Sequence, residues 1–537
     1  MSKLFERLIK KRNITPSFLN PKYEALSDPF ELKDMEEATS RIKQALKNKE
    51  KILIYGDYDV DGVTASTLME EALKLAGAIP DNISIMLPDR FADGYGMSSK
   101  LVKRAKKDAI DLVITVDCGS RNHEIIEELN IFKIDTIVTD HHETDDTMPD
   151  AVAVINPHRK DYPCEKLCNL AGVGVAFMVA EALRKEGMIK NSQEKWLLDL
   201  VIIGTISDSM LLTGENHILG YFGLKVLSKT RRPGLKELMR KAGVKKLNSE
   251  SIGFQIGPRL NAAGRLETAE ISLNLLRAAS ASEAAAIAEK LESLNKKRKT
   301  EQISATREII ERGEKADPVI IEVGKWHEGI LGIVAGRLVE EYKKPAFVFT
   351  ETTGGVYKGS GRSFGDFNLA DALNYVKDAI IGGGGHAAAA GVRVEQKNLY
   401  AFREKMNDYY KSLNLKNQEK YLKHVPDLDI EDLSECSLDF LEELKAFEPF
   451  GPGNEEPIFR LKNTKIDLIR KMGAEGQHLR IDVRDRNGNT LKLVAFYAPE
   501  NWLNLDYDMI IEPIIKLTEN EFNGARSVEG RIIDIVL

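Results

Sequence analysis

The sequence contains few cysteines and no long apolar segment. Only four of its 537 residues are cysteine. Cys164 and Cys168 have no second cysteine or histidine pair at the spacing of a zinc site, so we interpret these two as ordinary thiols. No stretch is long and apolar enough for a membrane span, and the first residues are too charged for a signal peptide. We therefore expect a cytoplasmic protein that does not bind membranes.

The sequence also lacks a strong excess of one charge. It has 76 Lys and Arg against 83 Asp and Glu, a net charge of −7. Composition alone therefore does not indicate nucleic-acid binding, and any such activity must depend on local basic surfaces. With 43% hydrophobic and 30% charged residues, the chain has the composition of an ordinary globular protein. Its length predicts two to four domains.

Three carboxylates follow the first predicted buried strand. The apolar run 52–54 is followed by Asp57, Asp59 and Asp61 at every second position, and then by a helical pattern. Like charges this close raise one another's pKa, and a divalent cation is the usual partner that offsets such repulsion. The alternative interpretation is an acidic turn, which is the commoner fate of an isolated Asp-x-Asp pair.

From Lys51 onwards, strand-like runs alternate with helical patterns. Strands are predicted at 52–55, 83–87, 112–116, 136–139 and 153–155, and helices at 63–76, 98–107 and 122–129. This alternation predicts a doubly wound parallel sheet. Such sheets bind ligands beyond the carboxyl ends of their strands.

Further candidate metal ligands follow later apolar segments. Asp117, His141 and His142 come after two of the predicted strands, and Asp208 comes after the apolar segment 197–206. Taken singly, Asp117 could cap a helix and the two histidines could form a polar turn. Together they place oxygen and imidazole ligands at one sheet edge, which suits manganese, magnesium or cobalt better than a closed zinc site.

A polar helix predicted over 281–314 is a candidate connector to a second α/β unit that starts at Pro318.

The segment 257–265, which precedes this helix, combines two arginines and an asparagine with small residues, which fits an approach to a polyanion. The alternative is a structural loop whose arginines pair with carboxylates. In the second unit, the glycine-rich runs 358–363 and 382–391 leave backbone N–H groups free for a phosphate.

From about residue 420 the pattern becomes all-β. The Asn-Gly pairs at 487–488 and 523–524 predict two hairpins, and the short strands predict a small barrel of the OB type. The basic residues there mingle with Phe496, Tyr497 and Trp502, as single-strand binding requires. These basic residues are Arg470, Lys471, Arg480, Arg484 and Lys492. The alternative is a solvated face over an aromatic core.

With these motifs placed, the chain resembles the DHH phosphoesterase superfamily and, within it, the RecJ family of single-strand-specific exonucleases. The segments that carry the resemblance are Gly56–Gly62, Leu87–Arg90 with Gly94–Gly96, Asp117–Gly119, Asp140–His142, Gly204–Asp208, Gly257–Arg265, Trp326–Gly329, Ser360–Ser363, Gly384–His386 and Phe450–Asn454. They run over nearly the whole chain. One departure is the sequence Ser-Met-Leu-Leu after Asp208, where the family usually has apolar residues and a proline.

The resemblance implies a role for each matching residue. The implied ligands of a site for two divalent ions, Mn²⁺ or Mg²⁺, are Asp59, Asp61, Asp117, His141 and Asp208, with Asp117 bridging. Asp57 and His142 are implied to be adjacent catalytic residues, and His386 to contact the scissile phosphate. The implied residues for the 5′-phosphate and DNA are Arg90, Ser360, Arg362, Arg259, Asn261 and Arg265. The alternative is that Arg90 and Arg362 merely pair with nearby carboxylates such as Asp89 and Asp366.

The resulting architecture is an α/β fold with an added barrel. We expect a packing segment at 1–45, a DHH catalytic domain at 46–268, a connecting helix at 269–316, a smaller α/β domain at 317–415 and an OB domain at 420–537. We expect the first of these segments to pack on the domain that follows it.

The function implied is a 5′-to-3′ exonuclease that degrades single-stranded DNA to 5′-mononucleotides in DNA repair and recombination. The expected protein is a monomer, with a single-strand-binding protein or a helicase as further partners. Two alternatives stay open at this point. One is a phosphodiesterase for dinucleotides or short oligonucleotides, and the other is a non-catalytic replication scaffold.

Overall fold

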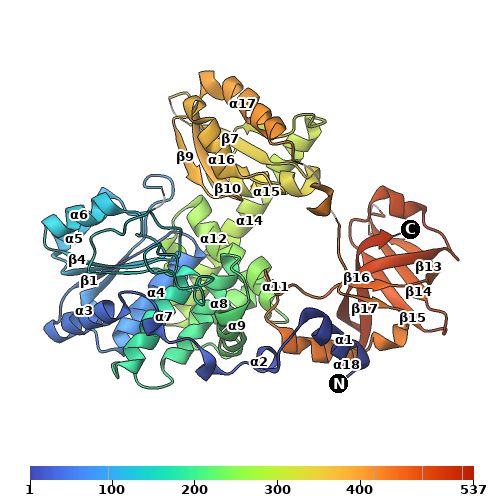
Figure 1. The fold of residues 1–537 in the computed structure, drawn as a ribbon, viewed down its shortest axis with the longest axis horizontal. Coiled ribbons are helices and arrows are strands. Elements are labelled where there is room, and N and C mark those ends of the chain that lie inside the picture. Colours follow the sequence, from blue (N-terminus) through green and yellow to red (C-terminus); the bar gives the residue numbers. More distant parts are fainter. Residues whose placement is uncertain are drawn as a thin grey trace. The chain divides into compact units, whose positions relative to one another are not determined.

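The computed structural model describes residues 1–94, 96–352, 354–415, 418–421, 423–473, 476–522 and 524–536. They form two compact units (Figure 1). One comprises Asp28–Asp208 and Lys225–Tyr421, and the other comprises Met1–Ser27, Ser209–Leu224 and Leu422–Leu537. Within the described residues, no helix is both long and apolar enough to cross a lipid bilayer.

The first unit begins with the predicted parallel sheet. Its strands lie in the order β2-β1-β3-β4-β5, and every neighbouring pair is parallel. Their bounds are Ile52–Gly56 for β1, Ile83–Met86 for β2, Leu112–Val116 for β3, Asp135–Thr139 for β4 and Ala153–Ile155 for β5. Strands β1 and β3 are buried along their whole length, as their continuous apolar runs predict. The doubly wound fold class is thereby confirmed.

Helices cover this sheet and extend beyond it. Their bounds are Met35–Asn48 for α3, Val60–Leu75 for α4, Ser99–Asp108 for α5, His123–Ile131 for α6, Gly172–Lys185 for α7, Leu198–Ser207 for α8, Pro233–Ala242 for α10, Ser249–Ser251 for α11, Gly257–Leu266 for α12 and Glu270–Arg277 for α13. The apolar segment 197–206 resembles the strands in composition, but it forms α8. It packs against α4 and α7, and burial on several sides explains why it carries no polar face.

A 31-residue helix, α14 (Ala281–Glu311), leads to the second α/β domain. There the sheet order is β6-β7-β8-β10-β9, with β6 and β7 parallel and the other pairs antiparallel. The strand bounds are Ile320–Gly324 for β6, Ala346–Thr352 for β7, Val356–Arg362 for β8, Gly382–Gly385 for β9 and Ala389–Glu395 for β10. The helices are α15 (Leu331–Tyr342), α16 (Leu369–Tyr375) and α17 (Leu399–Ser412).

The glycine-rich run 358–363 has the composition of a loop, but most of it is strand β8. A Cβ on Gly359 would lie 2.3 Å from the Phe349 ring, and one on Gly361 would lie 2.5 Å from the Phe347 ring. The two glycines therefore make room for buried phenylalanines on one face of the strand. Because side chains alternate along a strand, the residues between and beside these glycines share the opposite face.

The second unit contains the predicted C-terminal barrel. Its strands are Thr464–Met472 for β13, His478–Arg484 for β14, Thr490–Ala495 for β15, Ile510–Phe522 for β16 and Ala525–Val536 for β17. These five close on one another through the pairs β13–β14, β14–β15, β15–β17, β16–β17 and β13–β16, as expected of an OB fold. Strands β11 (Leu428–Ile430) and β12 (Phe459–Leu461) extend the sheet, and helix α18 (Leu438–Leu444) packs beside it.

The N-terminal segment packs differently from our expectation. Helices α1 (Lys3–Arg12) and α2 (Pro16–Leu19) belong to the unit with the barrel, whereas α3 and the short turn Pro29–Glu31 before it pack on the parallel sheet domain. Leu4, Phe5 and Leu8 are buried in the core of the barrel unit, and Phe5 meets the ring of Phe447. Helix α9 (Gly214–Leu227) also lies mostly in this unit. Pairings between segments this far apart in the chain leave no local signal in the sequence.

Candidate active site

The three alternating carboxylates surround the start of helix α4. Asp57 follows β1, and the Asp59 side chain caps α4 by accepting a hydrogen bond from the Gly62 N–H at 3.1 Å. The buried Asp61 carboxylate accepts two N–H groups at the start of α7, from Gly172 at 2.6 Å and Val173 at 2.9 Å. The positive end of α7 thus stabilises the negative charge of Asp61.

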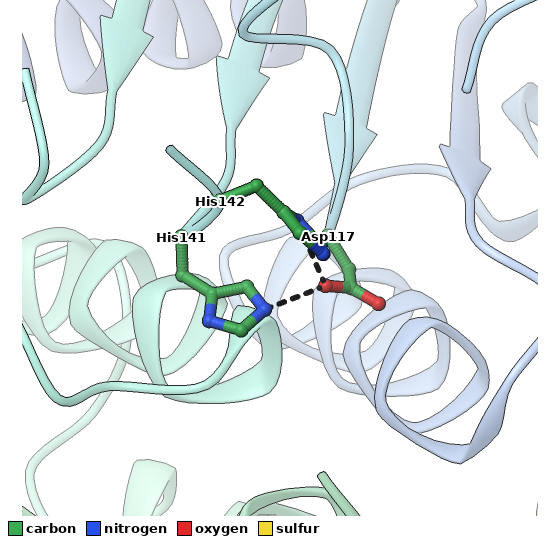
Figure 2. Close-up of side chains that lie close together, drawn as sticks. All are labelled: Asp117, His141 and His142. Atoms are coloured by element: carbon green, nitrogen blue, oxygen red, sulfur yellow. Dashed lines mark ion pairs between the residues drawn. The ribbon is translucent and has the colours of Figure 1, made fainter. Parts of the chain in front are cut away.

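Asp117 and the two histidines meet at the ends of β3 and β4 (Figure 2). The Nε2 atom of His141 lies 3.2 Å from Oδ1 of Asp117, and Nδ1 of His142 lies 3.9 Å from the same oxygen. Helix α7 closes on this point, because a Cβ on Gly172 would lie 2.5 Å from Cβ of Asp117. A larger residue at position 172 would therefore displace the carboxylate.

His141 also joins the residues at the ends of α4 and α8. Its Nε2 atom lies 3.6 Å from Oδ2 of Asp208, which caps the C-terminus of α8, and 3.8 Å from Oδ2 of Asp61. Three groups have ligand atoms within 4.8 Å of one another and could each hold a metal ion: Asp117, His141 and His142; Asp61, His141 and Asp208; and Asp57, Asp59 and Asp117. All the predicted metal-site residues thus lie together.

Asp140 organises the histidine pair, a role that the sequence motif alone does not assign. Its carboxylate accepts the backbone N–H groups of Ser120, His141 and His142 and contacts Nδ1 of His142 at 2.8 Å. Although burial alone would raise the pKa of Asp140, the hydrogen bond and charge of His142 lower it below the usual range. In the sequence, this role could have been inferred from the aspartate that directly precedes the two histidines.

Without cations the cluster is electrostatically unfavourable. Burial, followed by the charge of Asp59, raises the pKa of Asp61 to about 7. Burial, followed by the charges of Asp61 and Asp59, raises the pKa of Asp208 to about 8. The pKa values of Asp57 and Asp117 are also well above normal, mainly through burial and then through neighbouring carboxylates.

His141 and His142 have opposite protonation states. Burial and the neighbouring His142 lower the pKa of His141 to about 3, so its ring is neutral and free to bind a metal ion. Burial would also lower the pKa of His142, but the hydrogen bond and charge of Asp140 raise it to about 9. One neutral imidazole and one cationic imidazole therefore lie side by side.

The donor set fits divalent metal ions. Among the described residues, Oδ1 of Asp57 and Oδ1 of Asp117 are buried side-chain atoms without a hydrogen-bond partner. Buried carboxylate oxygens need a donor or a cation, and hard oxygen ligands with one or two imidazoles suit Mn²⁺ or Mg²⁺. Asp117 and His141 each belong to two of the three groups, and of the two only the carboxylate has several lone pairs on two oxygens with which to bridge a pair of ions.

A group of arginines lies beside the metal-site loop. The Arg90 guanidinium lies 4.9 Å from the centre of the Tyr58 ring, which sits between Asp57 and Asp59 in the sequence. Among the described residues, Arg90 does not form an ion pair with Asp89. The Asp89 carboxylate instead accepts the N–H groups of Phe91 and Ala92.

Ser360 and Arg362 project from the same face of β8 toward the start of α15. A Cβ on Gly332, in the first turn of α15, would lie 2.7 Å from Nη2 of Arg362 and 2.9 Å from Oγ of Ser360. Arg362 donates to Ser360 Oγ at 3.2 Å. Asp366, the other candidate partner, instead contacts Lys420 and Tyr421. A helix N-terminus, a hydroxyl and a guanidinium are donors suited to an anion, and we refer to this set as the pocket.

Arg265 completes this pocket from the last turn of α12. It donates to the backbone oxygen of Gly329 at 3.3 Å, just before α15 begins. Burial lowers the pKa of Arg265 to about 9, with further contributions from the charges of Arg90, Arg362 and Arg298. These guanidiniums thus influence one another, and a phosphate would relieve their repulsion.

His386 is exposed at the turn between β9 and β10. Its partial burial lowers its pKa, and the charges of Arg362 and His142 lower it further. His386 is therefore within electrostatic reach of one residue from each group, and its contact with a phosphate stays a prediction.

Two of the predicted DNA-binding residues occupy other surroundings. Arg259 is buried, pairs with Glu292 at 2.6 Å and donates to the Gln255 backbone oxygen, so its guanidinium is already occupied. Asn261 lies half-buried on α12, and its role stays a prediction. Tyr95 of the Gly94–Gly96 motif lies outside the described residues.

The barrel carries a basic and aromatic outer face. The strand register places Arg470, Arg480, Val494 and Arg531 side by side on β13, β14, β15 and β17. Beyond this row, the His478 ring contacts those of Phe496 at 5.4 Å and Tyr497 at 4.8 Å, and both aromatics are exposed.

Trp502 is not part of this face, because it is buried in the barrel core. Three of the predicted basic residues also form ion pairs: Arg480 with Asp482, Arg484 with Asp467, and Lys492 with Glu529. The surface available to bases is therefore smaller than the sequence predicted.

Comparison with known proteins agrees with this arrangement. Three family models match the chain: the DHH family N-terminal domain at residues 51–205, the DHHA1 domain at 316–412 and the RecJ OB domain at 427–534. The single-stranded-DNA-specific exonuclease RecJ of Bacillus subtilis is 35% identical over 96% of this chain and 65% of its own length. The protein of the same name from Salmonella typhimurium is 32% identical over 94% of this chain and 90% of its own length.

Solved structures extend the likeness over the whole chain. The crystal structure of RecJ in complex with Mn²⁺ from Thermus thermophilus matches with a TM-score of 0.84 and 28% identity, covering 100% of this chain and 76% of that one. The structure of the same protein in complex with Mg²⁺ matches with a TM-score of 0.78 and 26% identity, covering 100% and 74%.

Proposed function

The chain belongs to the RecJ family of single-stranded-DNA-specific exonucleases, and from this premise we propose that it is a metal-dependent 5′-to-3′ exonuclease that hydrolyses single-stranded DNA to 5′-mononucleotides. We propose Asp59, Asp61, Asp117, His141 and Asp208 as the ligands of two divalent ions, Mn²⁺ or Mg²⁺, with Asp57 and His142 beside them. The observation that carries the proposal is that the candidate metal ligands lie near a group of arginines that could bind a phosphate.

The chain's own residues position the strand in this proposal. Arg90, Arg265, Ser360 and Arg362 bind the terminal 5′-phosphate, and the first turn of α15 adds its N–H groups. His386 contacts the next phosphate, which places the first internucleotide bond at the metal cluster and sets mononucleotide release. Bound divalent ions supply the activation of water and the stabilisation of charge on the phosphate.

The cationic His142 has a separate task. Its ring is oriented by Asp140 and is positively charged near neutral pH, as its raised pKa requires. Charge that develops on the phosphate oxygens or on the leaving group is stabilised by such a preorganised cation. The neutral His141 ring serves as a metal ligand instead.

The barrel binds the remainder of the strand by stacking bases on Phe496 and Tyr497, with Arg531 and Arg470 on its phosphates. This surface favours a polymer over a dinucleotide, and the complete set of metal ligands argues against a non-catalytic scaffold. We further propose a monomeric, cytoplasmic enzyme of DNA repair and recombination, supplied with strands by a helicase or a single-strand-binding protein.

A comparison of substrates tests this function. The purified protein is incubated with Mn²⁺ or Mg²⁺ and, in separate reactions, with a long single DNA strand, the matching duplex, a dinucleotide and an RNA strand of equal sequence. Mononucleotides should appear rapidly from the single DNA strand only. Equal or faster hydrolysis of the dinucleotide would assign the protein to the short-substrate class instead, and hydrolysis of none would support a scaffold.

A further inference from the structure

Arg298 lies near the middle of the connecting helix α14, and its side chain is 8% exposed. Its guanidinium donates to Oδ1 of Asn295 at 3.0 Å and 3.3 Å and to Oε1 of Gln302 at 3.4 Å. Both acceptors are neutral amides. These hydrogen bonds fix the side chain in place but do not compensate its positive charge.

The protein treats its other fully buried arginines differently. Among the described residues, three arginines are more than nine-tenths buried: Arg159, Arg259 and Arg298. Arg159 pairs with Asp34 and Asp161, and Arg259 pairs with Glu292. Removing a cation from water without an anionic partner is costly. A buried guanidinium that meets only neutral acceptors is therefore explained best by a negative charge that arrives with a ligand.

The surroundings of Arg298 point to the proposed phosphate pocket. Helix α14 packs along α12, which carries Arg265 in its last turn, and both helices contact the turn at 328–330 that precedes α15 (Figure 1). The charge of Arg298 reaches Arg265, and the charges of Arg259 and Arg337 reach Arg298. Arg298 therefore lies on a helix that packs against the one carrying Arg265, close enough for the two charges to influence each other.

We propose that Arg298 is a specificity-determining residue that acts through Arg265 and makes the pocket select a terminal phosphate over a terminal hydroxyl. The inference rests on the proposed function of that pocket. A terminal phosphate carries about −1.5 to −2 charges near pH 7, whereas a hydroxyl carries none. A fixed charge near the contacting arginines strengthens binding in proportion to the charge of the ligand, so the gain falls on the phosphorylated end.

The test compares three variants. Arg298→Gln removes the charge and keeps hydrogen bonds, Arg298→Lys keeps the charge, and Arg159→Gln is a control that opens a buried ion pair elsewhere. Binding of 5′-phosphorylated and 5′-hydroxyl single strands is measured by fluorescence anisotropy in EDTA, so that no cleavage occurs. Cleavage of both strands with Mn²⁺ and the melting temperature of the free protein are measured in parallel.

Arg298→Gln should reduce the preference for the phosphorylated strand at least fivefold, mainly through KM, while Arg298→Lys stays within twofold of wild type. The melting temperature of Arg298→Gln should equal or exceed that of wild type, because repulsion among cations is relieved. Arg159→Gln should melt lower and keep the wild-type preference. A merely structural role for Arg298 predicts the reverse, a lower melting temperature with an unchanged preference.

The outcomes separate this inference from the proposed function. If Arg298→Gln keeps the wild-type preference, or if Arg298→Lys loses as much of it as Arg298→Gln does, the inference is overturned while the nuclease activity stands. If the wild type shows no preference for a phosphate, the inference is likewise overturned. If the wild type cleaves no strand but its binding preference depends on Arg298, the pocket assignment is supported and the exonuclease function is not.

Discussion

Replacing Asp117 with asparagine should abolish hydrolysis and leave the metal-free protein at least as stable as wild type. The substitution keeps the size of the side chain and removes an ionisable ligand from the centre of the cluster. Asp117 is 2% exposed, and its Oδ1 atom lacks a hydrogen-bond partner among the described residues. It also belongs to two of the three groups that could hold a metal ion, so both would lose a charged ligand.

The expected changes in stability and in rate can be worked out from the site. The rise of the Asp61 pKa from 3.8 to about 7 corresponds to about 4 kcal/mol against its charged form, at about 1.4 kcal/mol per pKa unit. Burial is the largest cause of this rise, followed by the charge of Asp59, and Asp117 is not among its causes. Because the pKa of Asp117 is itself raised well above normal, its substitution should remove little repulsion from the metal-free cluster, on the order of 1 kcal/mol or less. Loss of a bridging ligand should cost about 4 kcal/mol of transition-state stabilisation, or roughly a thousandfold in rate.

Three measurements on one preparation check this reasoning. Single-strand cleavage should fall by roughly three orders of magnitude. Strand binding in EDTA should stay close to wild type, and the melting temperature in EDTA should equal or slightly exceed that of wild type. Asp135→Asn, at the opposite end of β4, serves as a charge-matched control. Turnover by Asp117→Asn within tenfold of wild type, or a lower melting temperature in EDTA, would refute the bridging role.

The remaining predictions concern the pocket, the barrel and pH. Arg362→Ala should lower the rate preference for 5′-phosphorylated over 5′-hydroxyl strands by roughly 10- to 100-fold, since a hydrogen bond to a charged group contributes about 1.5–3 kcal/mol; an unchanged ratio would show that Arg362 does not read the end. Phe496→Ala should weaken binding of long strands by about 1–3 kcal/mol and leave cleavage of very short strands unchanged; equal binding would give this face another task. Because the folded-state pKa values of Asp61 and Asp208 are raised to about 7 and 8, their contribution to stability is present below about pH 4 and is lost as pH rises through 7–8. The melting temperature of the metal-free protein should therefore fall from pH 6 to pH 9 while the stabilisation by Mg²⁺ grows, and a pH-independent difference between the two would contradict the raised pKa values.

The sequence alone indicated much of the catalytic domain because its signals are local. Short apolar runs marked each parallel strand, and the residues after these strands necessarily meet at one sheet edge. This is why Asp57, Asp117 and His141 can be grouped from their positions in the sequence. The same rule left the segment 197–206 unassigned, since a short apolar run fits a buried helix as well as a strand, and the structure shows that it forms most of α8.

Features that depend on distant partners could not be predicted. The pairing of Arg259 with Glu292 is invisible in a segment whose composition suits a polyanion. The helices at 3–12 and 16–19 pack with residues beyond 420, and the sequence of neither segment indicates that the two are partners. The glycines of β8 suggest a loop because the phenylalanines that require them lie on another strand.

The most direct test of the central claim is digestion of one DNA single strand labelled at either end, with Mn²⁺ or Mg²⁺ present. A pocket that captures a terminal 5′-phosphate beside the metal cluster predicts that a 5′ label appears at once as a mononucleotide. A 3′ label should stay in progressively shorter strands until late in the reaction. Immediate release of the 3′ label, or fragments cut from the middle of the strand, would contradict the account.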